Sequence, residues 1–169
     1  NSWMKENKTT LVATLLMPNI LKTTMNGSNI QIENITEYPF KNNLKFKITQ
    51  SKPSKFTIKI RKPDWVKKVK TKEKFKIEND FIVIERDFST NDIVHVSFDV
   101  EVQIKTDNNG SHYFIHGALL YAIPINANEI AGKNYRNNFN DFTYEPTSNI
   151  KYLFKNDIKT KYQKGKIHA

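Results

Sequence analysis

The sequence contains no cysteine and only five glycines in 169 residues. The lack of cysteine excludes disulfides, thiolate nucleophiles and cysteine-ligated zinc within this chain. The glycines form neither a phosphate-binding loop nor a Gly-x-Ser-x-Gly turn, so hydrolase-type nucleophilic catalysis has no support. No apolar run reaches the about 18 residues of a membrane-spanning helix. We therefore expect no membrane partner and a globular domain.

Residues 1–5 show none of the features of a signal peptide, which are a basic start, an apolar stretch and a cleavage site of small residues. The absence of this pattern in one stretch of chain does not fix the compartment. The sequence is therefore compatible with an extracytoplasmic or a cytoplasmic location.

Arginine is also scarce, although the chain is strongly basic, with a formal net charge of +10. Clustered basic residues bind nucleic acids by releasing counterions from phosphate. Here the lysines are spread over the whole length, and the three arginines are Arg61, Arg86 and Arg136. Because bidentate recognition of bases and phosphates relies on arginine, we expect a solvated lysine surface and no nucleic-acid partner.

Apolar and polar residues alternate along most of the chain, a pattern typical of half-buried strands. The longest example covers 93–105 and predicts one long strand. Shorter examples cover 44–48 and 56–60. Further strands are expected at 11–17, 20–24, 30–35, 75–77 and 81–85, and as one strongly apolar strand over 112–125.

Two turn signals separate these strands, Asn26-Gly27 and Asn79-Asp80, and each fits a hairpin whose central residues adopt positive φ. Many short strands without a helical pattern predict an all-β fold, an antiparallel β-sandwich or jelly-roll-like domain with a C-terminal extension. The expected organisation is an N-terminal lead (1–8), the sandwich (9–125), an irregular extension that belongs to a second sandwich or packs on another domain (126–160), and a disordered tail (161–169).

Histidines and carboxylates offer little for a metal or for catalysis. His112 and His116 have the spacing of two zinc ligands on a helix, but on a strand their side chains lie about 13 Å apart. A glycosidase needs a carboxylate pair with tuned pKa values. Eight acidic residues are candidates, but each alternates with apolar neighbours or lies in a turn: Glu33, Glu37, Asp64, Glu85, Asp87, Asp92, Asp99 and Glu101. We expect no catalytic residue, metal or cofactor in this chain.

Aromatic rings can stack on the apolar faces of sugars, so they are the remaining candidates for binding. Trp65, Tyr38 and Tyr113 are the candidate sugar-stacking residues, considered together with Trp3 and Tyr121. For any one of them, packing in the core or between domains is the favoured interpretation, because aromatic residues dominate core energetics.

Several motifs occur in an order and spacing that suggest a known family. They are Ile-Thr-Glu-Tyr-Pro-Phe (35–40), Ile-Lys-Ile-Arg-Lys-Pro-Asp-Trp (58–65), an Ile-x-Arg-like stretch with Asn-Asp-Ile-Val (81–102), Phe-Ile-His-Gly-Ala-Leu-Leu-Tyr-Ala (114–122) and Tyr-Glu-Pro-Thr-Ser with Tyr-Leu (144–153). Together they resemble the C-terminal β-sandwich region of glycoside hydrolase family 127, the β-L-arabinofuranosidase-like proteins. Four positions depart from the family pattern: His116 for Arg, Ala118 for Pro, Asn91 for Gly and Ile150 for Trp.

The resemblance implies a fold and a role for the chain. In that family a separate upstream (α/α)₆ barrel carries the catalytic machinery, a cysteine nucleophile and a zinc ion held by cysteines and a glutamate. The present chain has no cysteine, so no catalytic residue can be carried over. The resemblance therefore implies a non-catalytic accessory domain that supports a barrel of the same polypeptide, with a homodimer through the sandwich as a further expectation. The alternative is an independent carbohydrate-binding module for plant-type glycans.

Three residues receive structural roles on this hypothesis. Pro63 and Trp65 should end one strand and anchor the turn after it, and Gly117 should permit a close approach of backbones. If Trp65 is fully buried, its replacement by alanine should cost about 3 to 5 kcal/mol of folding free energy.

Overall fold

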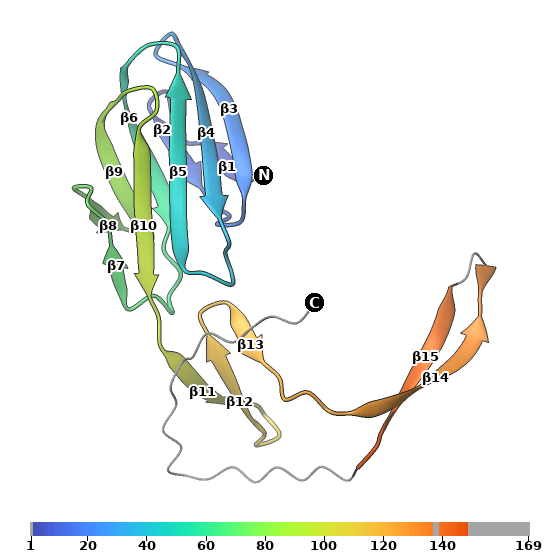
Figure 1. The fold of residues 1–169 in the computed structure, drawn as a ribbon. Coiled ribbons are helices and arrows are strands. Elements are labelled where there is room, and N and C mark those ends of the chain that lie inside the picture. The colour runs from blue at the N-terminus through green and yellow to red at the C-terminus, as the bar shows by residue number, and fades with distance from the viewer. Residues whose placement is uncertain (1, 137–138, 149–169) are drawn as a thin grey trace. The chain divides into compact units, whose positions relative to one another are not determined.

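The computed structural model describes residues 2–136 and 139–148, and within these ranges it contains strands and turns but no α-helix (Figure 1). The first sheet has the order β1-β2-β6-β9-β8. Its strands are β1 (Trp3–Lys5), β2 (Thr10–Ala13), β6 (Ser54–Arg61), β9 (Phe81–Phe88) and β8 (Lys76–Glu78). All neighbours in this sheet are antiparallel except β2 and β6, which run parallel.

The second sheet has the order β3-β4-β5-β10-β7 and is antiparallel throughout. Its strands are β3 (Asn19–Met25), β4 (Ser28–Thr36), β5 (Asn43–Gln50), β10 (Ile93–Asp99) and β7 (Lys68–Lys70). The all-β class and the sandwich predicted from the alternating pattern are confirmed. The parallel pair of β2 and β6 is a feature that the alternation could not indicate.

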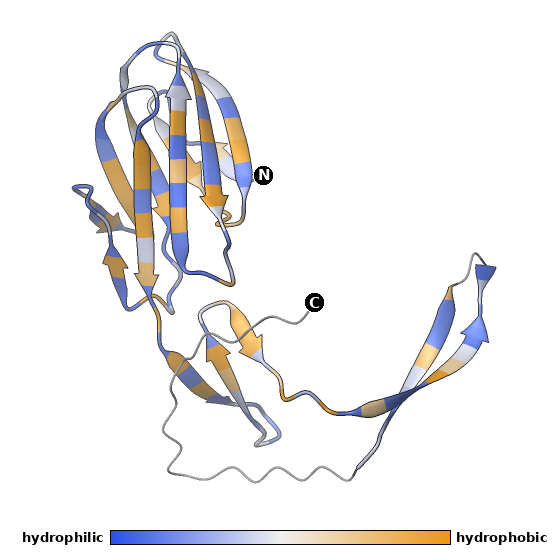
Figure 2. Cartoon of the chain, viewed as in Figure 1, coloured by the Kyte–Doolittle hydropathy of each residue, from blue (hydrophilic) through white to orange (hydrophobic). Residues whose placement is uncertain are grey.

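One hydrophobic core lies between these two sheets, because most of the strands point every second side chain inward. Figure 2 shows the result as alternating hydrophobic and hydrophilic bands along β5 and β10. The ring of Trp3 from the first sheet meets Phe46 of the second edge to face, with centroids 5.9 Å apart. Phe56 and Phe88 stack at 4.3 Å. Each large side chain buried in this way stabilises the fold by about 1.5–3 kcal/mol.

Both predicted hairpin turns are present. Asn26 and Gly27 have φ values of 51° and 68° between β3 and β4, and Asn79 and Asp80 have 46° and 63° between β8 and β9. Asparagine, aspartate and glycine tolerate this left-handed region better than other residues do. The turn chemistry of the sequence therefore fixes where these strands reverse.

The prediction of one strand over 93–105 is wrong. The chain pairs through Asp99, leaves the second sheet at Val100 and Glu101, and begins β11 (Val102–Thr106) in a different sheet. The neighbouring β7 is only three residues long and its pairing with β10 ends at Asp99. The alternating pattern continues across the break because β11 is also a strand, so the pattern alone could not reveal the change of sheet.

Two other strands are shorter than expected. The prediction of one strand over 112–125 is wrong, because Gly117, with a φ of 62°, turns the chain between β12 (His112–His116) and β13 (Leu119–Tyr121). These two strands and β11 form a three-stranded sheet. The strand expected over 11–17 ends at Ala13, since the next two amides both donate to the carbonyl of Ser2, at 3.0 and 3.4 Å, and break the ladder.

The extension is not irregular where it is described. It contains a hairpin of β14 (Ala127–Asn134) and β15 (Asn140–Pro146) with an irregular register between Ala131 and Asn134. The remainder of the extension from residue 149, and the expected tail over 161–169, lie outside the described residues. The contacts divide the chain into one compact unit of 1–103 with 115–119 and a second of 104–114 with 120–169. The expected domain boundaries themselves stay predictions.

Candidate functional site

Tyr38 and Trp65, two of the three candidate sugar-stacking residues, line one open hollow of about 260 Å³ in the first unit. The hollow lies where β2, β4 and β6 end, so three segments that follow strands build its walls. Tyr38 comes from the segment after β4, and Trp65 comes from the turn after β6. Thr14 to Met17, after β2, forms another wall, and Arg61, Pro63 and Asp64 complete it.

The two aromatic rings are partly buried and partly open to the hollow. Their planes are nearly parallel, 12° apart, with centroids at 6.5 Å. On its other side Trp65 meets the buried Phe98 edge to face, at 6.1 Å and 82°. Contact with the core therefore fixes the orientation of Trp65, and Trp65 in turn supports Tyr38. A fixed pair of rings beside open space can receive an apolar surface, either of a protein or of a sugar.

Side-chain amides hold the wall of 14–17 in place. The Nδ2 group of the buried Asn34 donates to the carbonyls of Leu16 and Met17, at 2.9 and 3.1 Å. Asn19 donates to the same Met17 carbonyl at 2.6 Å. This segment has left the sheet, so the two asparagines satisfy carbonyls that would otherwise have lost their ladder partners.

The opposite wall follows from Pro63, as the sequence predicted. β6 ends at Arg61, and the amide of Val66 donates to the Pro63 carbonyl at 3.1 Å, which closes a turn. This turn points the neighbouring Trp65 toward the core and leaves Asp64 exposed at the hollow. The prediction that Pro63 and Trp65 end the strand and anchor the turn agrees with these contacts.

Arg61 and Asp64 bring opposite charges to the hollow. Neither has an ion-pair partner within the part of the chain that the structure describes. Burial raises the pKa of the Tyr38 hydroxyl, and the nearby positive charge of Arg61 offsets part of that rise. The hydroxyl therefore stays protonated and available as a hydrogen-bond donor at neutral pH. The sequence analysis considered Asp64 only as a catalytic carboxylate and did not single out Arg61 as a site residue, although the place of both within the 58–65 motif beside Trp65 was a usable signal.

Gly117 lies close to the Trp65 ring and to Asn42. A Cβ atom there would be 3.3 Å from the Trp65 ring and 3.5 Å from Oδ1 of Asn42. The close approach expected at Gly117 is thus made to an aromatic side chain rather than to another backbone. The cost of about 3 to 5 kcal/mol for Trp65→Ala was expected only if Trp65 is fully buried. Trp65 is partly buried, so that cost does not apply.

The other aromatic candidates lie elsewhere. Tyr113 is 37% exposed on β12, is part of the second unit and does not line the hollow. Trp3 is 8% exposed and belongs to the core, and Tyr121 is an exposed residue of β13. Tyr38 and Trp65 therefore lie together within the first unit, and Tyr113 belongs to the second.

Four of the acidic candidates form ion pairs with lysines at the surface. Glu85 pairs with Lys55 at 3.0 Å across β6 and β9, and Asp99 pairs with Lys70 at 3.2 Å. Glu37 and Glu101 pair with lysines in the same way. Hydrogen bonding and attraction from Lys55 lower the pKa of Glu85. A general acid needs the opposite shift, so this carboxylate is unsuited to that role.

Asp92 belongs to a network that shapes the turn between β9 and β10. Its Oδ2 accepts hydrogen bonds from the amide of Ser89 at 2.9 Å and from Arg86 at 2.7 Å. Burial acts to raise the pKa of Asp92, but these two bonds and the positive charge of Arg86 outweigh it, so the pKa is lowered. Arg86 also pairs with Glu73 at 3.0 Å. These contacts hold the turn between β9 and β10 in place.

His112 and His116 lie at opposite ends of β12, the first exposed and the second buried. Over 2–136 and 139–148, no group of three histidine or acidic residues is arranged to hold a metal ion. The same ranges contain no helix that is long and apolar enough to cross a membrane.

Most of the two sheets matches the model of a known domain family. Residues 10–100 match the family described as "Beta-L-arabinofuranosidase, GH127 middle domain", which is more than half of the chain. The match includes the 35–40 and 58–65 motifs and both walls of the hollow, and it ends before β11. A search of curated proteins by sequence finds no significant match.

Solved structures share the fold at low sequence identity. A GH127 β-L-arabinofuranosidase from Geobacillus stearothermophilus superposes with a TM-score of 0.62 at 16% identity, over 86% of this chain and 31% of that one. A second GH127 β-arabinofuranosidase gives 0.59 at 20%, over 70% and 23%, and a glycoside hydrolase gives 0.60 at 14%, over 85% and 28%. The chain thus spans about a third or less of the length of each of these proteins.

Proposed function

The chain belongs to the GH127 β-L-arabinofuranosidase family through its middle domain, and on that premise we propose that it is a non-catalytic accessory domain of a glycoside hydrolase. Its role is to support a separate catalytic (α/α)₆ barrel of the same polypeptide. The observation that carries this proposal is the hollow of Tyr38 and Trp65, a recess with a fixed aromatic pair where β2, β4 and β6 end. Its partner is the barrel, and a homodimer through the sandwich is a further part of the proposal.

Exposed apolar side chains beside the hollow support docking to another protein surface. Leu15 and Met17, on one wall, are 45% and 52% exposed, and Phe40, two residues after Tyr38, is 60% exposed. Exposed large apolar side chains beside a recess favour contact with another protein surface. The aromatic pair is rigid before docking, so little side-chain entropy is lost when a partner covers it.

The state of the carboxylates supports a role without catalysis. Retaining and inverting glycosidases use one carboxyl group with a raised pKa as the acid. Among the residues that the structure describes, Glu85 and Asp92 are the two carboxyl groups with shifted pKa values, and basic partners lower both pKa values. Both act in ion pairs that join strands or shape turns.

The test has two readouts. First, the chain is incubated with an aryl β-L-arabinofuranoside, and we expect no release of the aryl group above the rate without protein. Second, amide exchange is compared between this chain alone and the same residues in the intact parent polypeptide. We expect slower exchange over 14–17 and 38–41 in the parent, because the barrel covers them. Turnover by the chain alone, or equal exchange in both proteins, would contradict the proposal.

A second candidate function is an independent carbohydrate-binding module. It is favoured by one observation, that two parallel aromatic rings share a hollow with the uncompensated Arg61 and Asp64. Sugar sites combine ring stacking with a few charged or polar hydrogen-bonding groups in this way. The hollow cannot hold a sugar and a barrel surface at once, so saturable binding of a neutral sugar to the intact parent at Trp65 would replace the docking proposal.

A further inference from the structure

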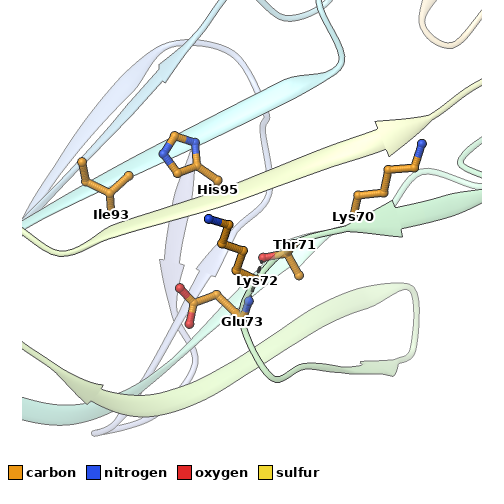
Figure 3. Close-up of a pocket in the computed structure, with 6 residues that line it drawn as sticks. All are labelled: Lys70, Thr71, Lys72, Glu73, Ile93 and His95. Atoms are coloured by element: carbon orange, nitrogen blue, oxygen red, sulfur yellow. Dashed lines mark hydrogen bonds between the residues drawn. The ribbon is translucent and has the colours of Figure 1, made fainter.

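A second recess lies on the outer face of the second sheet, β3-β4-β5-β10-β7, within the first unit. It has a volume of about 450 Å³ and is lined by Lys70, Thr71, Lys72, Glu73, Ile93 and His95. Figure 3 shows these side chains around the end of β7 and the adjoining part of β10, with Lys72 extending toward His95. We call it the basic groove. It shares no lining residue with the hollow of Tyr38 and Trp65.

The pairing of β5 with β10 brings further positive charge to the groove. Lys45 lies directly across from His95, and Lys47 directly across from Ile93. Directly paired residues point to the same face of a sheet, with Cβ atoms about 4.5–5.5 Å apart. Lys45 and Lys47 therefore stand on the same outer face as His95 and the exposed Ile93.

The acidic residues near the groove leave part of this charge uncompensated. Glu73 is held by Arg86, with its Oε2 3.0 Å from the guanidinium, and Asp99 is held by Lys70. Glu33 lies across from Lys47 in β4. Within the described residues, Lys45 and Lys72 have no carboxylate within ion-pair distance. The groove therefore presents two free ammonium groups beside His95.

We propose that the basic groove binds a carboxylate-bearing oligosaccharide, an acidic glycan built from uronic acid units. Lys45 and Lys72 face the sugar carboxylates, His95 contributes a hydrogen bond, and Ile93 contacts the apolar face of a ring. The carbohydrate class rests on the proposed role in a glycoside hydrolase. The requirement for negative charge rests on the groove itself.

Two features favour this ligand over other classes. No phenylalanine, tyrosine or tryptophan lines the groove, so a nucleic-acid base or a neutral sugar would find only the small ring of His95 to stack on. The one nearby arginine, Arg86, is committed to Glu73 and Asp92, so the bidentate contact that suits phosphate is missing. Lysines acting as separate point charges suit carboxylates spaced along a flexible chain.

The test is a titration of the ¹⁵N-labelled 169-residue chain with tetragalacturonate at low salt, followed by NMR. We expect saturable shifts confined to amides of 43–47, 70–73 and 93–97, and weakening of the affinity as salt is raised. The double variant Lys45→Gln/Lys72→Gln should bind about three- to tenfold more weakly, from two exposed ion pairs. Its unperturbed spectrum away from these strands serves as the check on folding.

The matched control is Lys8→Gln/Lys52→Gln, which removes the same charge at exposed positions outside the groove. We expect this control to bind within twofold of the unaltered chain. Equal weakening in both double variants would overturn the proposal, because binding would then follow net charge alone. Tighter binding of a single-stranded oligonucleotide, shifts confined to Trp65 and its neighbours, or no shifts at all would overturn it too. Equal weakening, tighter oligonucleotide binding or no shifts would leave docking of the barrel untouched, since docking is tested by exchange over 14–17 and 38–41. Shifts at Trp65 would count against docking as well, because they would place a sugar in the hollow.

Discussion

The sandwich and the β14–β15 hairpin are both built from paired strands, yet they bury very different amounts of apolar surface. In the sandwich the inward residues of β5, Phe46 and Ile48, are fully buried between two sheets. In the hairpin Ile130 and Phe142 are 45% exposed and Tyr144 is 61% exposed. The difference lies in the second layer, because strand pairing satisfies backbone hydrogen bonds but a single two-stranded ribbon covers neither of its faces.

This comparison indicates what the hairpin is for. An isolated two-stranded ribbon is marginally stable in water, and these strands carry aromatic residues that gain stability only when covered. This part of the chain is expected to belong to a second sandwich or to pack on another domain. That expectation stays a prediction, and the exposed apolar residues of the hairpin are the physical reason for it. The sandwich, by contrast, closes its core with its own residues.

The largest effect should come from truncating the closed core. Phe46→Ala should lower the free energy of unfolding by about 3 to 5 kcal/mol, since Phe46 is fully buried and touches both sheets. Phe142→Ala in the hairpin should change it by less than about 0.5 kcal/mol. Urea unfolding of both variants gives the two values. Similar values for the two would mean that the hairpin is part of the same cooperative core.

A smaller effect should follow from removing the support of the hollow. Asn34→Ala should cost about 2 kcal/mol, because the carbonyl of Leu16 loses its partner and that of Met17 retains only Asn19. Amide exchange over 14–17 should also accelerate relative to that over β5. Asn29→Ala, at an exposed position of the same strand, is the matched control. A loss of stability without faster exchange at 14–17 would show that Asn34 does not hold this wall.

Gly117→Ala should cost about 1–2 kcal/mol because of the positive φ, and crowding of the Trp65 ring should add to this cost. In a Trp65→Ala background the crowding disappears and only the backbone cost remains. A double-mutant cycle by thermal unfolding should therefore give a smaller penalty for Gly117→Ala when Trp65 is absent. Strict additivity of the two changes would contradict the contact.

The smallest effect is a change in pH dependence. The pKa of Asp92 is lowered in the folded state, so its stabilising contribution is present above its unfolded pKa of about 3.9 and is lost as pH falls through the folded value. Asp92→Asn should cost about 1 kcal/mol at pH 7, and the difference from the unaltered chain should shrink below about pH 4. Denaturant unfolding at pH 7 and pH 3 measures both. A cost for Asp92→Asn that is equal at both pH values would exclude the Arg86 network as its source.

Much of the fold could be predicted because local signals agree with it. Alternation identified the strands whose one face is buried, and Asn26-Gly27 and Asn79-Asp80 marked the turns. The prediction failed to place two strand ends, that of β10 at Asp99 and that of β12 just before Gly117. Alternation is insensitive to a change of sheet at the first, and at the second a single glycine in an apolar run carries the whole turn.

The site was harder to predict than the fold. The 35–40 and 58–65 motifs identified Tyr38 and Trp65, but only tertiary structure shows that they line one hollow with Arg61 and Asp64. The basic groove gave no motif at all, since Lys45, Lys72 and His95 come from three strands or strand ends that are far apart in the sequence. Residues that meet through β-sheet register leave no local pattern, so their grouping follows only from the pairing of β5, β10 and β7.

The central claim is that the hollow of Tyr38 and Trp65 receives protein rather than sugar. It is tested most directly by an NMR titration of the chain with arabinose, galactose and a neutral arabinan trisaccharide at millimolar concentration. The account predicts a well-dispersed spectrum with no saturable shift at Trp65, Tyr38 or the amides of 14–17. Localised, saturable shifts at those positions, abolished in Trp65→Ala, would contradict it and establish a carbohydrate-binding module.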